Sequence, residues 1–152
     1  MCALRMKTTV KLRSSGETVS HARTDISVRD VTYVIDEPTE RGGTNLGPTP
    51  TDTALGALIA CTNVIGSKCA DKLGIDAGDM SITCACDFDR RGVTLAEEID
   101  VPFQSIELAV KCHGSAKQDD LDRLAVEVEK FCPLSKLFIQ AGTKITTTWQ
   151  PA

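Results

Sequence analysis

Residues 47–61, GPTPTDTALGALIAC, decide the fold of this chain because they combine a complete helix start with an apolar helix body. Thr49 is a favoured N-cap residue, and Pro50 fills the favoured first position of a helix. Asp52 falls three residues after the cap, where an acidic side chain supports a helix start. The pattern therefore predicts that a helix begins at Pro50.

This helix is predicted to continue to about Leu73, with Gly74 as its C-terminal cap. Residues 54–61 are apolar on every face, and a helix that is apolar all round is buried all round. In a chain of 152 residues, such burial requires strands that wrap around the helix, and a second subunit is one way to complete it.

Alternation of apolar and polar residues marks two strands after the helix, because successive strand residues point to opposite faces of a sheet. A second helix is predicted to begin at Ser115, with Gln118 completing a capping box, and Pro133 interrupts it. The elements predicted here are strands over residues 80–88 and 106–113, a helix opening at 115, a short helix over 133–140 and a strand over 143–149.

The N-terminal third is predicted to form strands because it is rich in Val, Ile, Thr and Tyr. The strands are predicted over Met6–Leu12, Asp25–Val28 and Val31–Ile35, with a turn over Ser14–Glu17. The order of strands, helix, two strands, two helices and strand predicts an α+β fold with a mostly antiparallel sheet. The length predicts a single domain spanning residues 1–152.

The composition is that of an ordinary globular protein, with 41% hydrophobic residues, 25% charged residues and a net charge of −4. This mild acidity offers no basic patch to a nucleic acid. The most apolar run, Ala54–Ile65, is shorter than the roughly 20 residues that cross a bilayer. No apolar stretch follows the N-terminal charges, so no signal peptide is predicted. We therefore expect a cytoplasmic protein without nucleic-acid or membrane partners.

The chain has 7 cysteines, and an odd number argues against a fixed disulfide framework. Cys132 precedes Pro133 at the start of a short predicted helix, whose amides and dipole favour a thiolate. A plain packing role fits Cys132 equally well. Cys61 lies in the apolar helix and, by its surroundings alone, is a core cysteine. Cys2 is predicted to lie in a frayed terminus.

The other cysteines favour packing over metal binding. Cys84 and Cys86 are two residues apart on a predicted strand and so share a face, whereas zinc sites more often use two intervening residues. A metal site that uses Cys84, Cys86 and His113 is kept as a further alternative. Cys69 lies about two turns after Cys61 on the same helix face and is a backup resolving thiol. No metal and no bound cofactor are predicted.

Two segments resemble the signatures of the osmotically inducible protein C / organic hydroperoxide resistance (OsmC/Ohr) family. Residues 42–62 are similar to its glycine-rich loop, its proline pair and its apolar helix ending in Ala-Cys. Residues 131–135, FCPLS, are similar to its Cys-Pro-Val-Ser motif. The resemblance runs in order and spacing from Arg29 to Trp149.

The resemblance implies an OsmC-like intertwined homodimer, in which sheets wrap around central helices and the active sites lie near the subunit interface. It implies that Cys61 attacks an organic hydroperoxide and becomes a sulfenic acid. Cys132 would resolve this acid to an intramolecular disulfide, which an external dithiol would reduce. The implied activity is a thiol peroxidase that needs no cofactor besides the external dithiol reductant.

The chain departs from the family pattern at the helix start. The best-known peroxidase members carry, just after the proline, a glutamate that orients a catalytic arginine, and this chain has Thr51 there. Asp52 is the nearest carboxylate, and a capping partnership with Thr49 is the alternative to a supporting catalytic role. Arg13 lies near the first turn, where the family often places its arginine. The competing candidates are Arg23, Arg29 and Arg41.

This departure keeps a second function class open. The loss of the glutamate favours a redox-sensing or apolar-ligand-binding protein on the same scaffold, with little peroxidase turnover. The retention of both motif cysteines favours the enzyme. The two alternatives differ in whether hydroperoxide forms the Cys61–Cys132 disulfide and whether turnover follows.

Overall fold

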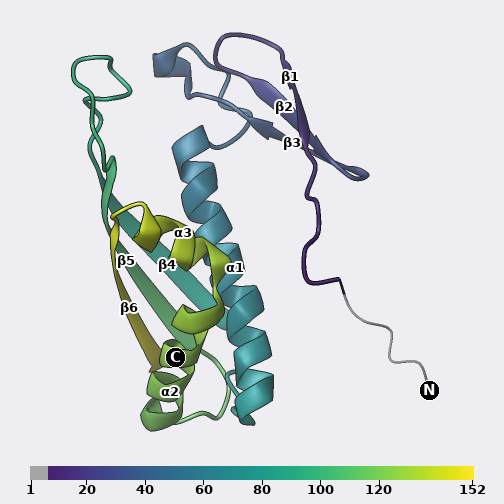
Figure 1. Ribbon diagram of the computed structural model, residues 1–152, viewed down its shortest axis with the longest axis vertical. Helices are drawn as coiled ribbons and strands as arrows, with labels where there is room; N and C mark the ends of the chain where they lie inside the picture. Colours follow the sequence, from purple (N-terminus) through teal and green to yellow (C-terminus); the bar gives the residue numbers. More distant parts are fainter. Residues whose placement is uncertain (1–6) are drawn as a thin grey trace. The chain divides into compact units, whose positions relative to one another are not determined.

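The computed structural model describes residues 7–152, so Cys2 and Met6 lie outside the described residues. The chain divides after Thr53 into two compact units, called here the N-terminal unit and the C-terminal unit (Figure 1). The elements are β1 (Ser15–Thr18), β2 (Thr24–Val28), β3 (Val31–Ile35), a 3-10 turn (Thr39–Arg41), α1 (Pro50–Leu73), β4 (Met80–Phe88), β5 (Phe103–Cys112), α2 (Gln118–Phe131), α3 (Pro133–Gln140) and β6 (Lys144–Pro151).

The N-terminal unit holds an antiparallel sheet in the order β1-β2-β3. The predictions of β2 and β3 are confirmed to within one residue. Two predictions are wrong: residues 7–12 form no strand, and residues 15–18 form β1 rather than a turn. The chain turns later because the Ser20 hydroxyl accepts hydrogen bonds from the amides of Ala22 and Arg23, which closes the β1–β2 turn.

A buried carboxylate organises the loop that leads from β3 to α1. Asp36 is fully buried and accepts hydrogen bonds from the amides of Glu37, Thr44 and Leu46 and from the Thr44 hydroxyl. These bonds stabilise the charged form, so the pKa of Asp36 is lowered, with the Thr44 hydroxyl as the main cause. The glycine-rich loop is therefore a fixed structure tied to one side chain.

The C-terminal unit is built on a second sheet in the order β4-β5-β6. β4 and β5 pair antiparallel, whereas β5 and β6 pair parallel. A parallel pair requires a crossover connection, and α2 and α3 supply it. The prediction of an α+β fold with mostly antiparallel strands is confirmed, and the strands lie in two separate three-stranded sheets.

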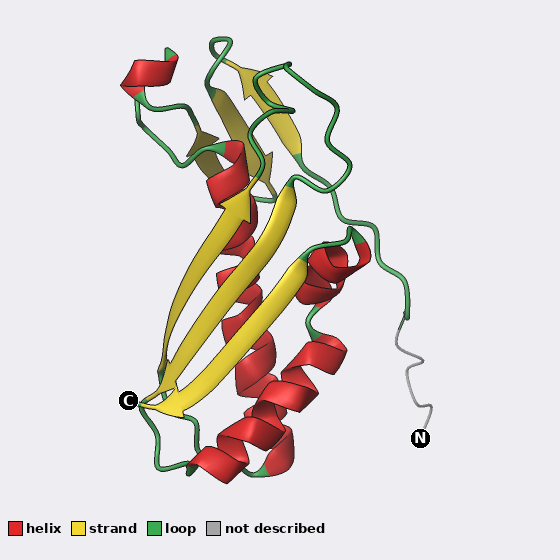
Figure 2. Ribbon diagram, turned by 90° about the vertical axis from the view of Figure 1, so that its left-hand side faces the viewer, coloured by secondary structure: helices red, strands yellow, loops and turns green. Residues whose placement is uncertain are grey.

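The helices α1, α2 and α3 all cover the same face of this second sheet (Figure 2). The central strand β5 points Ile106, Leu108, Val110 and Cys112 into the core, and its intervening residues face away. Gly66 of α1 packs on the sheet so closely that a Cβ atom there would lie 3.1 Å from Cη2 of Trp149. The absence of a side chain at Gly66 therefore sets the distance between α1 and β6.

The predicted bounds of α1, from Pro50 to Leu73, are confirmed. Gly74 follows in the left-handed region at φ +67°, as a C-terminal glycine cap requires. The expectation that α1 is buried all round is wrong for the single chain, because its buried residues, Leu58, Thr62, Gly66, Cys69 and Ala70, follow one stripe. Among residues 7–152, α1 alone is long and apolar enough to cross a membrane, a criterion that core helices of soluble proteins also meet.

The prediction that α2 opens at Ser115 is wrong, since the helix begins at Gln118. Ser115 instead donates its hydroxyl (2.8 Å) and its amide (3.1 Å) to the carboxylate of Asp76, in the loop after α1. The side chain of Gln118 donates to the carbonyl of Trp149 in β6 at 2.7 Å rather than closing a capping box. Long-range partners therefore replaced the local cap.

Candidate functional site

Cys61 and Cys132 lie together in the C-terminal unit, although 71 residues separate them in the chain. Their Sγ atoms are 3.3 Å apart. Cys61 projects from α1, and Cys132 lies at the junction between α2 and α3. A small movement of either side chain would bring the two sulfurs to the roughly 2.05 Å of a disulfide bond. The structure thus brings together the two cysteines that the sequence singled out.

The position of Cys132 follows from its place between two helices. Its amide donates to the carbonyl of Val128 at 2.9 Å, which closes the last turn of α2. The following Pro133 occupies the first position of α3, and the Sγ atom of Cys132 accepts the amide of Ser135 at 3.5 Å. Cys132 is therefore the N-cap of α3, with sulfur in the position where oxygen is usual. The side chain is fully buried.

Cys61 is half-buried and thus the more accessible of the two thiols. Burial is the main influence and raises the pKa of the Cys61 thiol. The backbone amide of Leu134, in the first turn of α3, lowers this pKa, and the neighbouring Cys132 raises it. The net direction is upward, so Cys61 needs a further positive influence to be a thiolate at neutral pH.

Asp52 acts as the capping partner of Thr49. The Thr49 hydroxyl donates to Oδ2 of Asp52 at 2.7 Å, and the Asp52 amide donates back to that hydroxyl at 3.2 Å. Within residues 7–152, Oδ1 of Asp52 has no hydrogen-bond partner. The carboxylate therefore keeps one oxygen for a cation while it caps the helix, so the two roles weighed from the sequence are compatible.

The four candidate arginines differ in what they already contact. Arg23 pairs with Asp25 at 2.8 Å, and Arg41 pairs with Glu37 at 2.7 Å. In the described part of the chain, neither Arg13 nor Arg29 forms an ion pair. Arg13 lies in the irregular segment before β1. It remains a candidate for the supporting cation together with Arg29.

The metal-site alternative gains no support. Cys84 and Cys86 lie half-buried on the helix-covered face of β4. His113 contacts the hydroxyl of Ser81, whose side chain lies on the opposite, exposed face, at 2.9 Å. Across residues 7–152, no three His, Cys, Asp or Glu side chains form a group suited to a metal ion. Cys69, the backup resolving thiol, is buried in the core.

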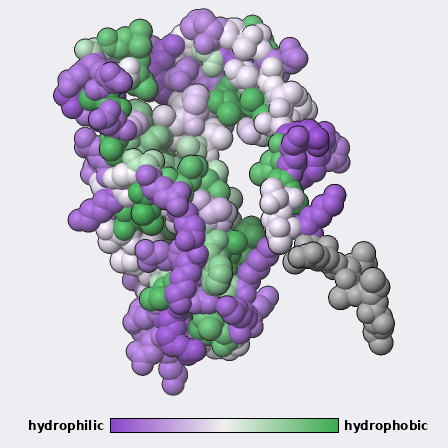
Figure 3. Space-filling view, viewed as in Figure 1, coloured by the Kyte–Doolittle hydropathy of each residue, from purple (hydrophilic) through white to green (hydrophobic). Residues whose placement is uncertain are grey.

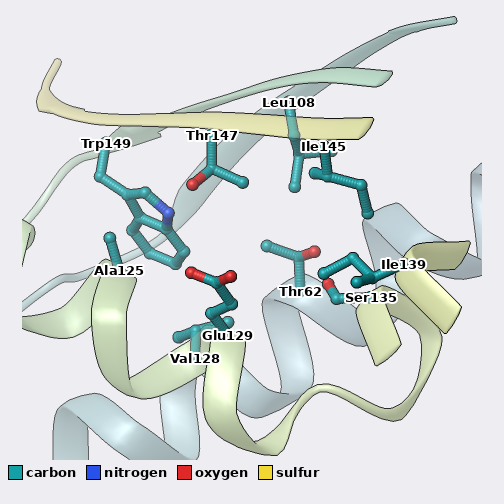
Figure 4. A pocket seen from close by; sticks show the side chains of 10 residues that line it. All are labelled: Thr62, Leu108, Ala125, Val128, Glu129, Ser135, Ile139, Ile145, Thr147 and Trp149. Atoms are coloured by element: carbon teal, nitrogen blue, oxygen red, sulfur yellow. The ribbon is translucent and has the colours of Figure 1, made fainter. Parts of the chain in front are cut away.

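A small cavity lies between the helices and strands β5 and β6 (Figure 4). Its volume is about 40 Å³, enough for a few water molecules. Thr62, the neighbour of Cys61, and Ser135, whose amide contacts Cys132, form part of its wall, and the carboxylate of Glu129 points into it. The sequence did not reveal this cavity, because its lining joins five elements that only the fold brings together.

The fold and the thiol pair define an α+β protein with a candidate dithiol site. The family model described as OsmC-like protein matches residues 43–148. The chain therefore belongs to the OsmC-like protein family, as its resemblance predicted. Among curated proteins, no sequence matches this chain.

Solved structures of this fold family are similar to the chain over nearly its whole length. The OsmC-like protein from Mycoplasma pneumoniae superposes with a TM-score of 0.77 at 16% identity, covering 94% of this chain and 98% of that one. The organic hydroperoxide resistance protein OsmC from Legionella pneumophila gives 0.67 at 16% identity, covering 95% and 99%. OhrB of Bacillus subtilis gives 0.65 at 16% identity, covering 93% and 98%. At these identities the likeness establishes the fold.

Proposed function

We propose that this protein is a thiol peroxidase that reduces organic hydroperoxides through Cys61 and Cys132. The observation that carries the proposal is the 3.3 Å separation of the two Sγ atoms. Two thiols held at this distance form a disulfide with little further movement of the backbone. Membership of a family whose solved relatives include organic hydroperoxide resistance proteins supports the substrate class.

The proposed reaction has three steps. The Cys61 thiolate attacks the terminal peroxide oxygen, the O–O bond breaks, and the alkoxide takes a proton and leaves as an alcohol. The Cys132 thiol then attacks the Cys61 sulfenic acid, and the S–S bond forms as water leaves. An external dithiol reduces this disulfide by two exchange steps and is itself oxidised to a disulfide.

The roles of the two cysteines follow from their exposure. Cys61 is half-buried and can be reached by a substrate, whereas Cys132 is fully buried and can reach only Cys61. Cys61 is accordingly the attacking thiol and Cys132 the resolving thiol. The substrate is proposed to approach Cys61 from its exposed side.

The raised pKa of Cys61 calls for a supporting cation. Arg13 is proposed for this role, and the free Oδ1 of Asp52 is proposed to orient it while Oδ2 stays with Thr49. This arrangement would replace the glutamate that other family members carry at the position of Thr51.

The protein is also proposed to act as an intertwined cytoplasmic homodimer. The face of α1 opposite its buried stripe exposes small and apolar residues, Gly56, Ala57, Ala60 and Val64. In the space-filling view, apolar surface gathers over the region of α1 and α3 (Figure 3). A second copy of the chain would cover this face and complete the burial that the sequence of α1 predicts.

A redox sensor or apolar-ligand-binding protein is the second candidate function. The observations that favour it are Thr51 in place of a glutamate and the raised pKa of Cys61, both of which slow peroxide reduction. Such a protein would form the disulfide without rapid turnover.

Consumption of tert-butyl hydroperoxide with dithiothreitol tests the proposal. Wild type is expected to consume hydroperoxide rapidly, and Cys61→Ser is expected to lose this activity. Cys84→Ser removes another half-buried thiol and is expected to retain it. Consumption no faster than with dithiothreitol alone would contradict the peroxidase and leave the sensing or binding function.

A further inference from the structure

An ion-pair bridge joins α1 to the last turn of α2. The carboxylate of Glu127 accepts two hydrogen bonds of 2.9 Å. The Nζ atom of Lys72 in α1 donates to Oε1, and the Nζ atom of Lys130 in α2 donates to Oε2. The Nζ atom of Lys72 also lies 5.0 Å from the centroid of the Phe131 ring. Lys72 therefore holds two residues of the last α2 turn, through a charge pair and through a cation–π contact.

The bridge occupies the turn that positions Cys132. Phe131 directly precedes Cys132, and the amide of Cys132 donates to the carbonyl of Val128, the neighbour of Glu127. Because Cys61 and Lys72 both lie on α1, the bridge and the thiol pair are two connections between the same helix and the same α2 end. A shift of this α2 end away from α1 would separate the sulfurs.

The charges of the bridge are unequally exposed. The side chain of Glu127 is 15% exposed, whereas that of Lys72 is 61% exposed and that of Lys130 is 58% exposed. Lys72, and then Lys130, lower the pKa of Glu127, so its carboxylate is charged throughout the neutral range. With 15% of its side chain exposed, Glu127 is largely sheltered, so its carboxylate is more fixed in place for the pair with Lys72 than that of a fully exposed ion pair.

We propose that Glu127 and Lys72 are positioning residues that keep Cys132 within reach of Cys61, and this inference rests on the proposed function of the two thiols. The bridge acts on the step in which Cys132 resolves the sulfenic acid and leaves the attack of Cys61 on the hydroperoxide unchanged. The bridge thus affects the conformation of the protein and not its reaction with the peroxide.

The first test measures the Cys61–Cys132 disulfide in dithiothreitol redox buffers, with quantification of the linked peptides by mass spectrometry. Glu127→Gln and Lys72→Met are expected to shift the equilibrium toward the dithiol by about two- to fivefold, the effect of an ion pair of this exposure. Lys72→Arg, which keeps the pair, is expected to restore the wild-type value. Lys130→Met removes only the pair within α2 and is the matched control, expected to leave the equilibrium unchanged.

High salt provides an independent arm of this test. Because the pair between Glu127 and Lys72 is partly exposed, salt screens it. The dithiol–disulfide equilibrium of wild type is therefore expected to move toward that of Glu127→Gln. The equilibrium of the Glu127→Gln protein itself is expected to be unaffected. The positioning role would be overturned if Lys130→Met and Lys72→Met shifted the dithiol–disulfide equilibrium equally. It would also be overturned if the variants lowered the melting temperature but none of them shifted this equilibrium.

The second test separates this inference from the proposed function. After addition of tert-butyl hydroperoxide, a dimedone probe traps the Cys61 sulfenic acid. Lys72→Met is expected to form the acid at the wild-type rate and to resolve it about two- to fivefold more slowly. If wild type forms no sulfenic acid, the peroxidase proposal fails, while the dithiothreitol equilibrium still decides whether the bridge positions Cys132. If the resolution rate is unchanged in Lys72→Met, the bridge plays no part in resolution.

Discussion

The hydroxyl of Thr49 makes two hydrogen bonds with Asp52. It donates to the carboxylate at 2.7 Å and accepts from the backbone amide at 3.2 Å. This reciprocal contact fixes the first turn of α1, the helix that carries Cys61. It also turns one carboxylate oxygen of Asp52 inward to the cap and leaves the other available. The helix start and the proposed support for the thiol therefore share one side chain.

The shared side chain allows stability and activity to be separated by substitution. Thr49→Ala removes the cap and is expected to lower the free energy of unfolding by about 1 kcal/mol. Asp52→Asn keeps a capping oxygen but removes the charge, and is expected to lower hydroperoxide turnover about tenfold, the effect of losing a charge-assisted hydrogen bond. Urea denaturation and turnover assays on both variants check this. Full turnover in Asp52→Asn would limit Asp52 to capping.

Alkaline pH is expected to destabilise the protein under reducing conditions. Burial raises the pKa of five thiols, those of Cys61, Cys69, Cys84, Cys86 and Cys112. Above the ordinary thiol pKa of about 8.5, the unfolded chain loses protons that the folded chain retains, so stability falls as the pH rises. Below that pH the thiols are protonated in both the folded and the unfolded chain, so they add no pH dependence to the free energy of unfolding. Urea denaturation at about pH 7 and about pH 9.5 measures the difference, and equal stability at both values would show that the thiols are well solvated.

Asp36→Asn is expected to loosen the loop over residues 42–48, because the amide can accept fewer hydrogen bonds than the carboxylate and brings donors of its own. Hydrogen exchange of the Thr44 and Leu46 amides is expected to accelerate. The lowered pKa of Asp36 adds a pH dependence in wild type. Its contribution is present above the unfolded carboxyl pKa and is lost as the pH falls through the lower folded value. Asp30→Asn, at an exposed position, is the control and is expected to change neither measurement.

Gly66→Val is expected to lower the free energy of unfolding by about 1–3 kcal/mol, the usual effect of overpacking. The new side chain would meet Trp149 and Met80, whose nearest atoms lie 3.1 and 3.2 Å from an ideal Cβ position. Gly66→Ala is expected to cost less, because the Met80 side chain is flexible and alanine favours the helix. Thermal denaturation checks both. A stability equal to wild type in Gly66→Val would mean that α1 can move away from the sheet.

A charge on the exposed face of α1 is expected to dissociate the proposed homodimer. Val64 is 50% exposed in the single chain, and a carboxylate in its place would be buried without a partner in the dimer. Val64→Asp is therefore expected to sediment as a monomer where wild type sediments as a dimer. A monomeric wild type would refute the homodimer directly.

The sequence predicted those elements whose signals are local. The cap and terminal glycine of α1 define its ends, and the alternation in β4 and β5 defines which side chains enter the core. The prediction at Ser115 was wrong because a distant partner, Asp76, outweighed the local pattern. The turn predicted at Ser14–Glu17 was wrong because the contacts of Ser20 close the chain reversal further along. The single-domain prediction over residues 1–152 stays a prediction.

The candidate site was predictable in part for the same reason. Cys61 and Cys132 stood out through their motifs, and the fold confirms that they lie together. The bridge through Glu127 and the cavity beneath Trp149 were not predictable, because charged residues on an amphipathic helix ordinarily face solvent without partners. Such contacts depend on where α2 lies against α1, which no local pattern encodes.

The full burial of Cys132 next to the half-buried Cys61 constrains how a disulfide between them would be reopened. An external thiol can reach only the sulfur of Cys61, so the mixed disulfide forms there and Cys132 is the leaving group. The amide of Ser135 already points at the Cys132 sulfur and would stabilise the charge that it acquires on leaving. In the proposed reaction, hydroperoxide and reductant would therefore both react at the sulfur of Cys61, and Cys132 would react only with Cys61 of its own chain.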